Sequence, residues 1–542
     1  MLIRRPGRRL VVGLTALALA VPLAASGCSG SATSTGANMS DTAKPDNRPV
    51  RNGGTLTVAL SEDPDALDPT TANTFVAREV FANFCEKLYD VNADLKIVPQ
   101  LAAKLPKMSD GGKTATIALR DGIRFNDGTP FDAAAVKKSL DRDLTLPTSS
   151  RKSELGAVRS VTVVDSRTIR ISMSRPFAPL SAQLADRAGM VMSPKALDHY
   201  GKNFGAHPVC VGPFKFLSRT SGNQIVLGRS TSYYDRAKVK LDKIVYKIVT
   251  DANVRSANLQ SGDIQVAERV ATTDVGNLTA DSSLKILPGG GLGYQGLTIN
   301  TANAHGATKP PGHVNTPLAT HPALRKAFEL SLDRNVINRV VFNGLYDPDC
   351  SPLPRHNKYR DSSLRCPTRD LARARTLVKR SGVKGPVPVS LLVSADSVSE
   401  RLGQVIQAMA KEAGFAVTVR PTEFVTALNQ ARNGKYDVIQ VGWSGRVDPD
   451  GDINDLITSG GSNNYSGLHD PVIDNAVHQA AATTDEAERT RLYRKAMDRE
   501  RQITGLIYLY HERYFLGTSA QIAGIRYYAD GIPRFTSAGY AK

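Results

Sequence analysis

Residues 387–443 read VPVSLLVSADSVSERLGQVIQAMAKEAGFAVTVRPTEFVTALNQARNGKYDVIQVGW, and this stretch decides the fold class. Apolar residues dominate 387–393, so this segment predicts a buried strand. Apolar residues then recur at helical spacing through 402–413, which predicts a helix that is capped by Ser399 and ended by Gly414. The stretch therefore begins as a strand followed by a helix.

The same alternation continues to the end of the stretch. Val417 and Val419 predict a second strand, 423–433 predicts a second helix that ends before Gly434, and 436–443 predicts a third strand. A β-α-β-α-β order predicts parallel strands with right-handed crossovers. Ligands of such sheets bind beyond the carboxyl ends of the strands. The residues just past the third strand are Trp443, Arg446 and Asp448.

The rest of the chain has the same mixed α/β pattern. Alternating or apolar runs predict strands at 55–60, 115–119, 168–173 and 241–249. Helical spacing predicts helices at 75–88 and 254–260, a helix that begins after Asp132, and a helix that begins at Pro322.

Length and composition exclude several classes of protein. The 542 residues predict three or four core-sized units at roughly 150 residues per domain. A hydrophobic content of 41% argues against a disordered chain, and the one long apolar run lies at the N-terminus, which excludes a polytopic membrane protein. The formal charge is +18, but the basic residues are dispersed, so we expect no nucleic-acid partner.

The N-terminus predicts export. Four arginines lie within residues 1–9, an apolar run covers 10–21, and small residues at 25–27 precede Cys28. This order predicts a signal peptide over 1–27 and resembles the bacterial lipobox, in which the cysteine is acylated. A plain signal peptide with a spare cysteine is the alternative, and both Sec and twin-arginine export stay open.

Residues 28–52 are rich in small and polar side chains and have no apolar periodicity. Such a segment does not form a core. It predicts a flexible, lipid-anchored tether, so that the globular body is held at the cell membrane from outside the cytoplasm.

Four further cysteines predict two disulfides. An even number in an exported chain is typical of disulfide bonding, with three possible pairings. Cys350 and Cys366 enclose a stretch rich in Pro and Arg, which a bridge would stabilise by roughly 3 kcal/mol. We therefore predict the pairs Cys350–Cys366 and Cys85–Cys210. The spacing does not suit structural zinc, and we expect no metal site.

Sequence signals for catalysis are weak. Gly291, Gly293 and Gly296 form a GxGxxG pattern, but a strand-like segment follows where a dinucleotide site needs a helix. Asp448 and Asp450 flank Pro449, which is more typical of a turn than of acid-base chemistry. We expect no enzymatic activity and no cofactor.

Several motifs together resemble the bacterial extracellular solute-binding proteins of family 5, which serve peptide and nickel ABC importers. The most specific is LRDGIRFNDGTPF at 119–131. The others include GGTL at 53–56, LDP at 67–69, PQLAA at 99–103, VGPF at 211–214 and LRKAF at 324–328.

The resemblance implies a two-lobe clamp of the type II periplasmic-binding class, with an extra subdomain in lobe I. The implied boundaries are 53–295 for lobe I with an insertion at about 91–208, 296–509 for lobe II, and 510–542 for a segment that returns to lobe I. The implied function is capture of short peptides for an ABC permease by a monomeric lipoprotein. The alternative is the same clamp with another small solute: an anionic compound, an opine, a sugar or a metal chelate.

The resemblance also implies a ligand site between the lobes. We expect its residues to be Asn73, Thr74, Tyr294, Gln295, Trp443, Arg446 and Asp448. In peptide binders of the family an Asp three residues after the Trp commonly pairs with the peptide's amino group, but Arg446 stands at that position here. Either Asp448 replaces that acid or Arg446 grips a carboxylate of the ligand.

Overall fold

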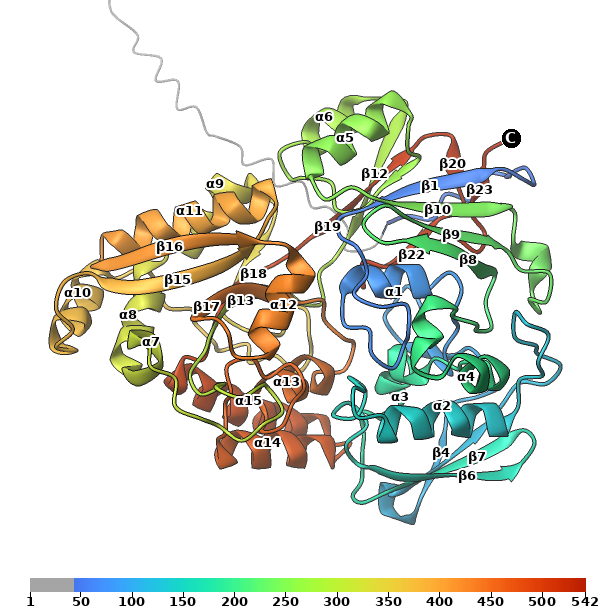
Figure 1. Ribbon diagram of the computed structural model, residues 1–542, viewed down its shortest axis with the longest axis horizontal. Coiled ribbons are helices and arrows are strands. Elements are labelled where there is room, and N and C mark those ends of the chain that lie inside the picture. The colour runs from blue at the N-terminus through green and yellow to red at the C-terminus, as the bar shows by residue number, and fades with distance from the viewer. Residues whose placement is uncertain (1–42) are drawn as a thin grey trace, which may run out of the picture. The chain divides into compact units, whose positions relative to one another are not determined.

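The structure, a computed structural model, describes residues 43–542, and its first large sheet has seven strands (Figure 1). Their order is β12-β19-β11-β1-β10-β9-β8. The bounds are β1 Thr55–Leu60, β8 Phe214–Thr220, β9 Gln224–Arg229, β10 Lys243–Ile248, β11 Val266–Ala267, β12 Leu284–Gly289 and β19 Tyr514–Ser519. Helices α1 (Phe75–Phe81), α5 (Ala252–Ser261) and α6 (Val275–Ala280) belong to the same part. We call this part the first lobe.

The second large sheet has six strands and contains the stretch that decides the fold. Its order is β14-β18-β13-β17-β15-β16. The bounds are β13 Tyr294–Ile299, β14 Asp347–Pro348, β15 Val387–Ser394, β16 Phe415–Thr422, β17 Val438–Trp443 and β18 Leu506–His511. β15 runs parallel to both β16 and β17. The predicted parallel arrangement of 387–443 is therefore confirmed.

Nine helices are described between β13 and β18, and with this sheet they form what we call the second lobe. Helices α11 (Ser397–Lys411) and α12 (Phe424–Arg432) connect its parallel strands. The others are α7 Pro317–Thr320, α8 Pro322–Ser331, α9 Arg334–Phe342, α10 Leu371–Arg380, α13 Asp450–Ile457, α14 Pro471–Ala481 and α15 Glu486–Ile503. The predicted helix start at Pro322 is confirmed, and its apolar face is buried with Leu324 and Phe328 in the core.

A smaller sheet within the first lobe has its own core. Its order is β4-β5-β7-β6, with α2 packed against β6 and β7. The bounds are β4 Lys107–Ser109, β5 Thr114–Ala118, β6 Val158–Asp165, β7 Thr168–Met173 and α2 Ala133–Thr145. The side chain of Asp132 caps α2 as predicted, since it accepts a hydrogen bond from the Ala135 N–H. Apart from Ala481 of α14, the core residues of this part lie between Leu88 and Val211.

The described chain also contains shorter elements. Three two-stranded sheets pair β2 (Tyr89–Val91) with β3 (Ile97–Pro99), β20 (Ile522–Ala523) with β23 (Gly539–Tyr540), and β21 (Arg526–Tyr527) with β22 (Pro533–Arg534). Two short helices, α3 (Leu180–Gln183) and α4 (Pro194–Tyr200), follow β7.

The chain passes between the two large sheets twice. The first passage runs through 290–293, between β12 and β13, and the second through 512–513, between β18 and β19. The two passages touch, because His511 Nδ1 lies 2.5 Å from the carbonyl oxygen of Gly293. The segment 290–293, which contains Gly291 and Gly293, thus links the two lobes.

Two predicted helices have different ends in the structure. The helix predicted over 75–88 ends at Phe81, because the Glu86 N–H donates to the Val211 carbonyl and pulls the chain into a long-range pairing. The helix predicted behind Ser399 begins earlier, because Asp396 caps it by accepting from the Val398 and Ser399 N–H groups.

The last residues predicted as tether pack on the globular body. The Arg51 N–H donates to the Tyr540 carbonyl, Val50 forms a β-bridge with Ala541, and Asp46 pairs with Lys285. These residues are therefore not part of a free tether. The signal peptide over 1–27 and the acylated Cys28 lie outside the described residues. Within 43–542, no helix is both long and apolar enough to span a membrane.

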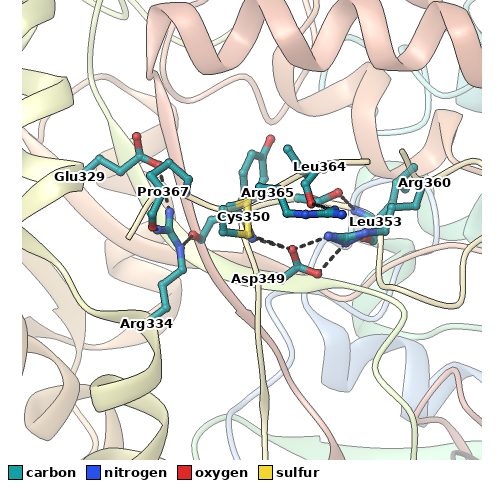
Figure 2. The surroundings of a disulfide bond; sticks show 12 residues. Glu329, Arg334, Asp349, Cys350, Leu353, Arg360, Leu364, Arg365 and Pro367 are labelled. Atoms are coloured by element: carbon teal, nitrogen blue, oxygen red, sulfur yellow. Dashed lines mark hydrogen bonds and ion pairs between the residues drawn. A yellow bond between two sulfur atoms is a disulfide. The ribbon is translucent and has the colours of Figure 1, made fainter. Parts of the chain in front are cut away.

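Both predicted disulfides are present. Cys85 pairs with Cys210, and Cys350 pairs with Cys366. Figure 2 shows the second bridge beside Asp349, whose carboxylate accepts from Arg360 at 2.6 and 2.8 Å. The bridge and this ion pair close the 351–365 loop at the same point.

Candidate functional site

A cavity of about 840 Å³ is lined by residues of both lobes. The first lobe contributes the loop after β1, the start of α1, and the segment after β11. The second lobe contributes β13, β17, and the starts of α11 and α12. The loops after β1 and β15 follow the carboxyl ends of parallel strands, which is where ligands of such sheets bind.

Five of the sequence-predicted site residues line this cavity: Asn73, Thr74, Tyr294, Gln295 and Trp443. Asp65 holds the first two in place, because its carboxylate accepts from both their N–H groups and from the Thr74 hydroxyl. The Gln295 amide donates to Glu512 and accepts from Gln440. Hydrogen bonds within the protein thus hold these three side chains of the cavity wall in place.

Two of these residues are aromatic and pack at the ends of adjacent strands. Tyr294 pairs with Trp443 in the register of β13 and β17, and its ring meets Tyr508 edge-on at 4.7 Å. The indole N–H of Trp443 donates to the Gly451 carbonyl at 2.8 Å. This bond fixes the ring against the loop that follows β17.

Arg446 and Asp448 are not among the residues that line the cavity. Arg446 is 7% exposed and forms an ion pair with Asp186 of the first lobe. Asp448 accepts from both terminal nitrogens of Arg489 on α15, at 2.7 and 3.0 Å. Each charge is already matched by a partner within the protein.

The cavity wall carries more acids than bases. Its charged residues are Glu62, Asp63, Asp65, Asp396, Glu423 and Glu512 against Arg219, Arg255 and Arg269. The wall therefore has three more carboxyl groups than guanidinium groups. Each arginine is engaged by the protein, with Arg219 bonded to Asp63.

Glu62 differs from the other acids because it has no hydrogen bond or ion pair within the described residues. Burial raises its pKa to about 8, and the neighbouring carboxylates Glu268, Asp65 and Glu423 act in the same direction, while Arg269 opposes them. The group is therefore largely protonated at neutral pH. A positive charge placed beside it would favour its ionised form.

Arg269 is held in an unusual backbone conformation. Its φ is +47°, in the left-handed region that side chains other than glycine rarely adopt. Arg255 stabilises this segment, because its guanidinium donates to the carbonyls of Glu268 and Arg269, each at 2.9 Å. Strained residues of this kind cluster at functional sites.

The Arg269 side chain lies over two stacked aromatic rings, those of Phe75, which lines the cavity, and Tyr514. Its guanidinium carbon is 5.0 Å from the ring centroid of Phe75 and 5.4 Å from that of Tyr514. Glu268 and Glu512 lie 3.1 and 3.7 Å from its nitrogens, yet within the described residues its buried Nε has no hydrogen-bond partner.

Sequence reasoning missed Glu62, Arg255 and Arg269. Glu62 lies two residues after β1, so the strand-end rule that led to Trp443 applies to it equally. No local signal marks the two arginines, because the conformation of Arg269 depends on a partner from another element.

Comparisons with known proteins agree with this fold. Residues 96–465 match the profile of the bacterial extracellular solute-binding proteins, family 5. The chain is 27% identical to the glutathione-binding protein GsiB of Pectobacterium atrosepticum, over 90% of this chain and 95% of that protein.

Solved structures include two with high similarity. AgaA from A. tumefaciens R10 in complex with agropinic acid has a TM-score of 0.81 at 25% identity, over 90% of this chain and 99% of that one. DppA from Helicobacter pylori in complex with the peptide STSA has a TM-score of 0.82 at 22% identity, over 91% and 99%, which shows the shared fold.

Proposed function

Because the chain belongs to the bacterial extracellular solute-binding proteins of family 5, we propose that it captures short peptides with a free amino group and delivers them to the importer's permease. At the coarser level it is a substrate-binding protein of an ABC importer that works outside the cytoplasm. The proposal concerns the ligand, its contacts and the lipid anchor.

The size of the cavity supports a small ligand. Its volume of about 840 Å³ falls within the range of about 300–1,000 Å³ that is common for small-molecule sites. A peptide of a few residues fits such a volume. Its main chain would find hydrogen-bonding partners in Gln295, Gln440 and the end of β17, which β15 pairs with only through Val438 and Ile439. Peptides often bind by adding to a strand segment with an open side.

The observation that carries the proposal is the unpartnered carboxyl of Glu62 in a cavity with excess acids. An ammonium group is the charge that this wall favours, because each cavity arginine is already engaged by the protein. The amino terminus of a peptide supplies that charge. The acid that peptide binders commonly place after the Trp would then be replaced by Glu62 in the other lobe.

Two of the similar proteins support a peptide-like ligand, and a third supports the alternative of another small solute. GsiB is named a glutathione-binding protein, and the DppA complex contains a peptide. The likeness to AgaA, whose complex contains agropinic acid, favours the alternative of another small solute. Agropinic acid is therefore the comparison ligand in the test.

We expect di- to pentapeptides with free amino groups to bind, and their N-acetylated forms to bind at least about tenfold more weakly, because a charged hydrogen bond contributes about 1.5–3 kcal/mol. Titration calorimetry with alanine peptides and with agropinic acid measures this. Equal binding of free and acetylated peptides, or binding of agropinic acid alone, contradicts the peptide proposal.

Glu62→Gln provides the residue-level control in the same titration. Near pH 6.5 the ligand's ammonium should convert Glu62 from its protonated to its ionised form, so the wild type should release about one proton on binding. Titration in two buffers of different ionisation enthalpy detects the proton. Glu62→Gln should abolish the release, whereas Glu412→Gln, which removes an exposed acid outside the cavity, should retain it.

The lipid anchor is tested separately at Cys28. We expect Cys28→Ala to move the protein from the membrane fraction to the medium, or to leave an uncleaved precursor, because acylation supplies the proposed anchor. Fractionation with immunoblotting measures the distribution. An unchanged membrane fraction argues for a different anchor.

A further inference from the structure

Asp186 and Arg446 form an ion pair that joins the two lobes. Asp186 lies between α3 and the single turn Arg187–Gly189 of the first lobe, and Arg446 follows β17 of the second. Asp186 is 5% exposed and Arg446 7%. We call them the latch pair.

Asp186 has further cationic neighbours from its own lobe. Arg78 of α1 donates to it at 3.2 Å and also reaches across to the Ser444 hydroxyl of the second lobe. Although burial alone would raise the pKa of Asp186, Arg446, Arg78 and Arg187 together hold it well below its usual range. The carboxylate is thus ionised throughout the physiological range.

Arg446 links this pair to the cavity wall. Its guanidinium carbon lies 4.6 Å from the centroid of the Trp443 ring, and its Nη1 donates to the Gly445 carbonyl. Its backbone N–H donates to Asp452 at 2.6 Å. Arg446 therefore sets the loop and the ring that form one side of the cavity.

We propose that the latch pair stabilises the closed clamp and positions Trp443, so that Asp186 and Arg446 raise ligand affinity without contacting the ligand. The inference rests on the proposed function, because it assumes that the lobes close around a ligand bound in the cavity between them. A contact made only when the lobes meet favours the closed state over the open one, and affinity scales with the fraction of protein in the closed state.

Because of the cations around Asp186, substitutions of Asp186 and of Arg446 should have different effects. If Arg446 is removed, Asp186 keeps Arg78, and the first lobe stays neutralised. If Asp186 is removed, Arg78, Arg187 and Arg446 lose the carboxylate that they share, and Glu154 and Asp452 are the remaining acids beside Arg446, so the closed state is disfavoured more. Arg446→Gln is therefore the informative variant, and Asp186→Asn should have the larger effect.

An ion pair that lies wholly within the second lobe provides a matched control. Arg334 of α9 is also buried and pairs with Glu329 of α8 at 3.0 Å (Figure 2). Both helices belong to the second lobe, so this pair does not join the lobes. Arg334→Gln removes a buried arginine and its acid contact without touching the other lobe.

The test measures closure directly. Spin labels at the exposed residues Val164 of β6 and Val472 of α14 report the distance between the lobes by electron resonance, with and without a free-amino alanine peptide. For Arg446→Gln we expect a longer and broader distance distribution without peptide, a shift in Trp443 fluorescence, and about tenfold weaker binding. Arg446→Lys should recover part of each effect because it restores the charge.

Two outcomes overturn the inference: wild-type distances and affinity in Arg446→Gln, or equal opening in Arg334→Gln, which is expected only to lower the melting temperature. Circular dichroism confirms that each variant is folded, and Asp186→Asn repeats the test from the other side. If the wild type binds no peptide, the proposed function fails, while the distances without peptide still test the latch.

Discussion

Replacing Arg255 with methionine is expected to destabilise the first lobe and to weaken ligand binding together. The guanidinium donates to four carbonyls, those of Val249, Thr250, Glu268 and Arg269, at 2.7–2.9 Å. Methionine fills a similar volume but leaves these acceptors without their donor. Because hydrogen bonds of charged groups contribute about 1.5–3 kcal/mol each, we expect a loss of about 3 kcal/mol or more after the cost of burying the charge is removed.

The effect on binding follows from the backbone of Arg269. A φ of +47° costs about 1–2 kcal/mol for a residue with a side chain, and the bonds from Arg255 offset that cost. Without them the segment relaxes, and the Arg269 guanidinium leaves its place over Phe75 and Tyr514. We therefore expect about tenfold weaker peptide binding in addition to the lower melting temperature.

Arg325 offers a control of the same chemistry in the other lobe. It is buried on α8 and donates to the carbonyls of Leu318, Ala319 and Ile503, but it does not line the cavity. Arg325→Met should lower the melting temperature by a similar amount and leave affinity unchanged. Calorimetry and peptide titration on both variants decide the matter, and equal loss of affinity in the two would contradict a local role for Arg255.

The sheet of the second lobe could be predicted because its signals are local. Residues 387–443 contain both the strands and the helices that connect them, so periodicity predicts a parallel sheet, although it does not specify that β15 lies between β16 and β17. The helix predicted over 75–88 was too long for the opposite reason. Its last turns are replaced by pairing with Val211, a contact more than a hundred residues away that no local pattern contains.

The residues of the candidate site also separate into those that local sequence could place and those that it could not. Trp443 could be placed at the cavity because it lies at the carboxyl end of a predicted strand, whereas Tyr294, the first residue of β13, was expected only from the family resemblance. Arg446 and Asp448 lie just beyond the same strand end, yet their partners are Asp186 and Arg489. An arginine near a strand end has the same sequence signature whether it faces a ligand or another lobe. The choice depends on which acid the fold brings to it.

The two disulfides could be paired from sequence, but their unequal importance follows from the structure. Cys85 and Cys210 are separated by 125 residues and lie where the chain enters and leaves the part of the first lobe that contains the four-stranded sheet. Around the bridge, Glu86 bonds to Val211, and Met192 forms a β-bridge with Cys210. The bridge therefore joins the two chain segments that lead into and out of this part of the first lobe.

Removal of this bridge is expected to have the largest effect on stability. In the chain-entropy model a loop of this length corresponds to about 5 kcal/mol, against about 3 kcal/mol for the 16-residue separation of Cys350 and Cys366. The Cys85→Ala, Cys210→Ala double variant should show a lower and split melting transition in scanning calorimetry, because the two chain segments that lead into and out of the part with the four-stranded sheet are no longer joined, and this part can then unfold separately. The Cys350→Ala, Cys366→Ala variant should show a smaller shift in a single transition. A larger shift in the second variant would mean that closure of the 351–365 loop, with Asp349 and Arg360, contributes more to stability than the Cys85–Cys210 bridge does.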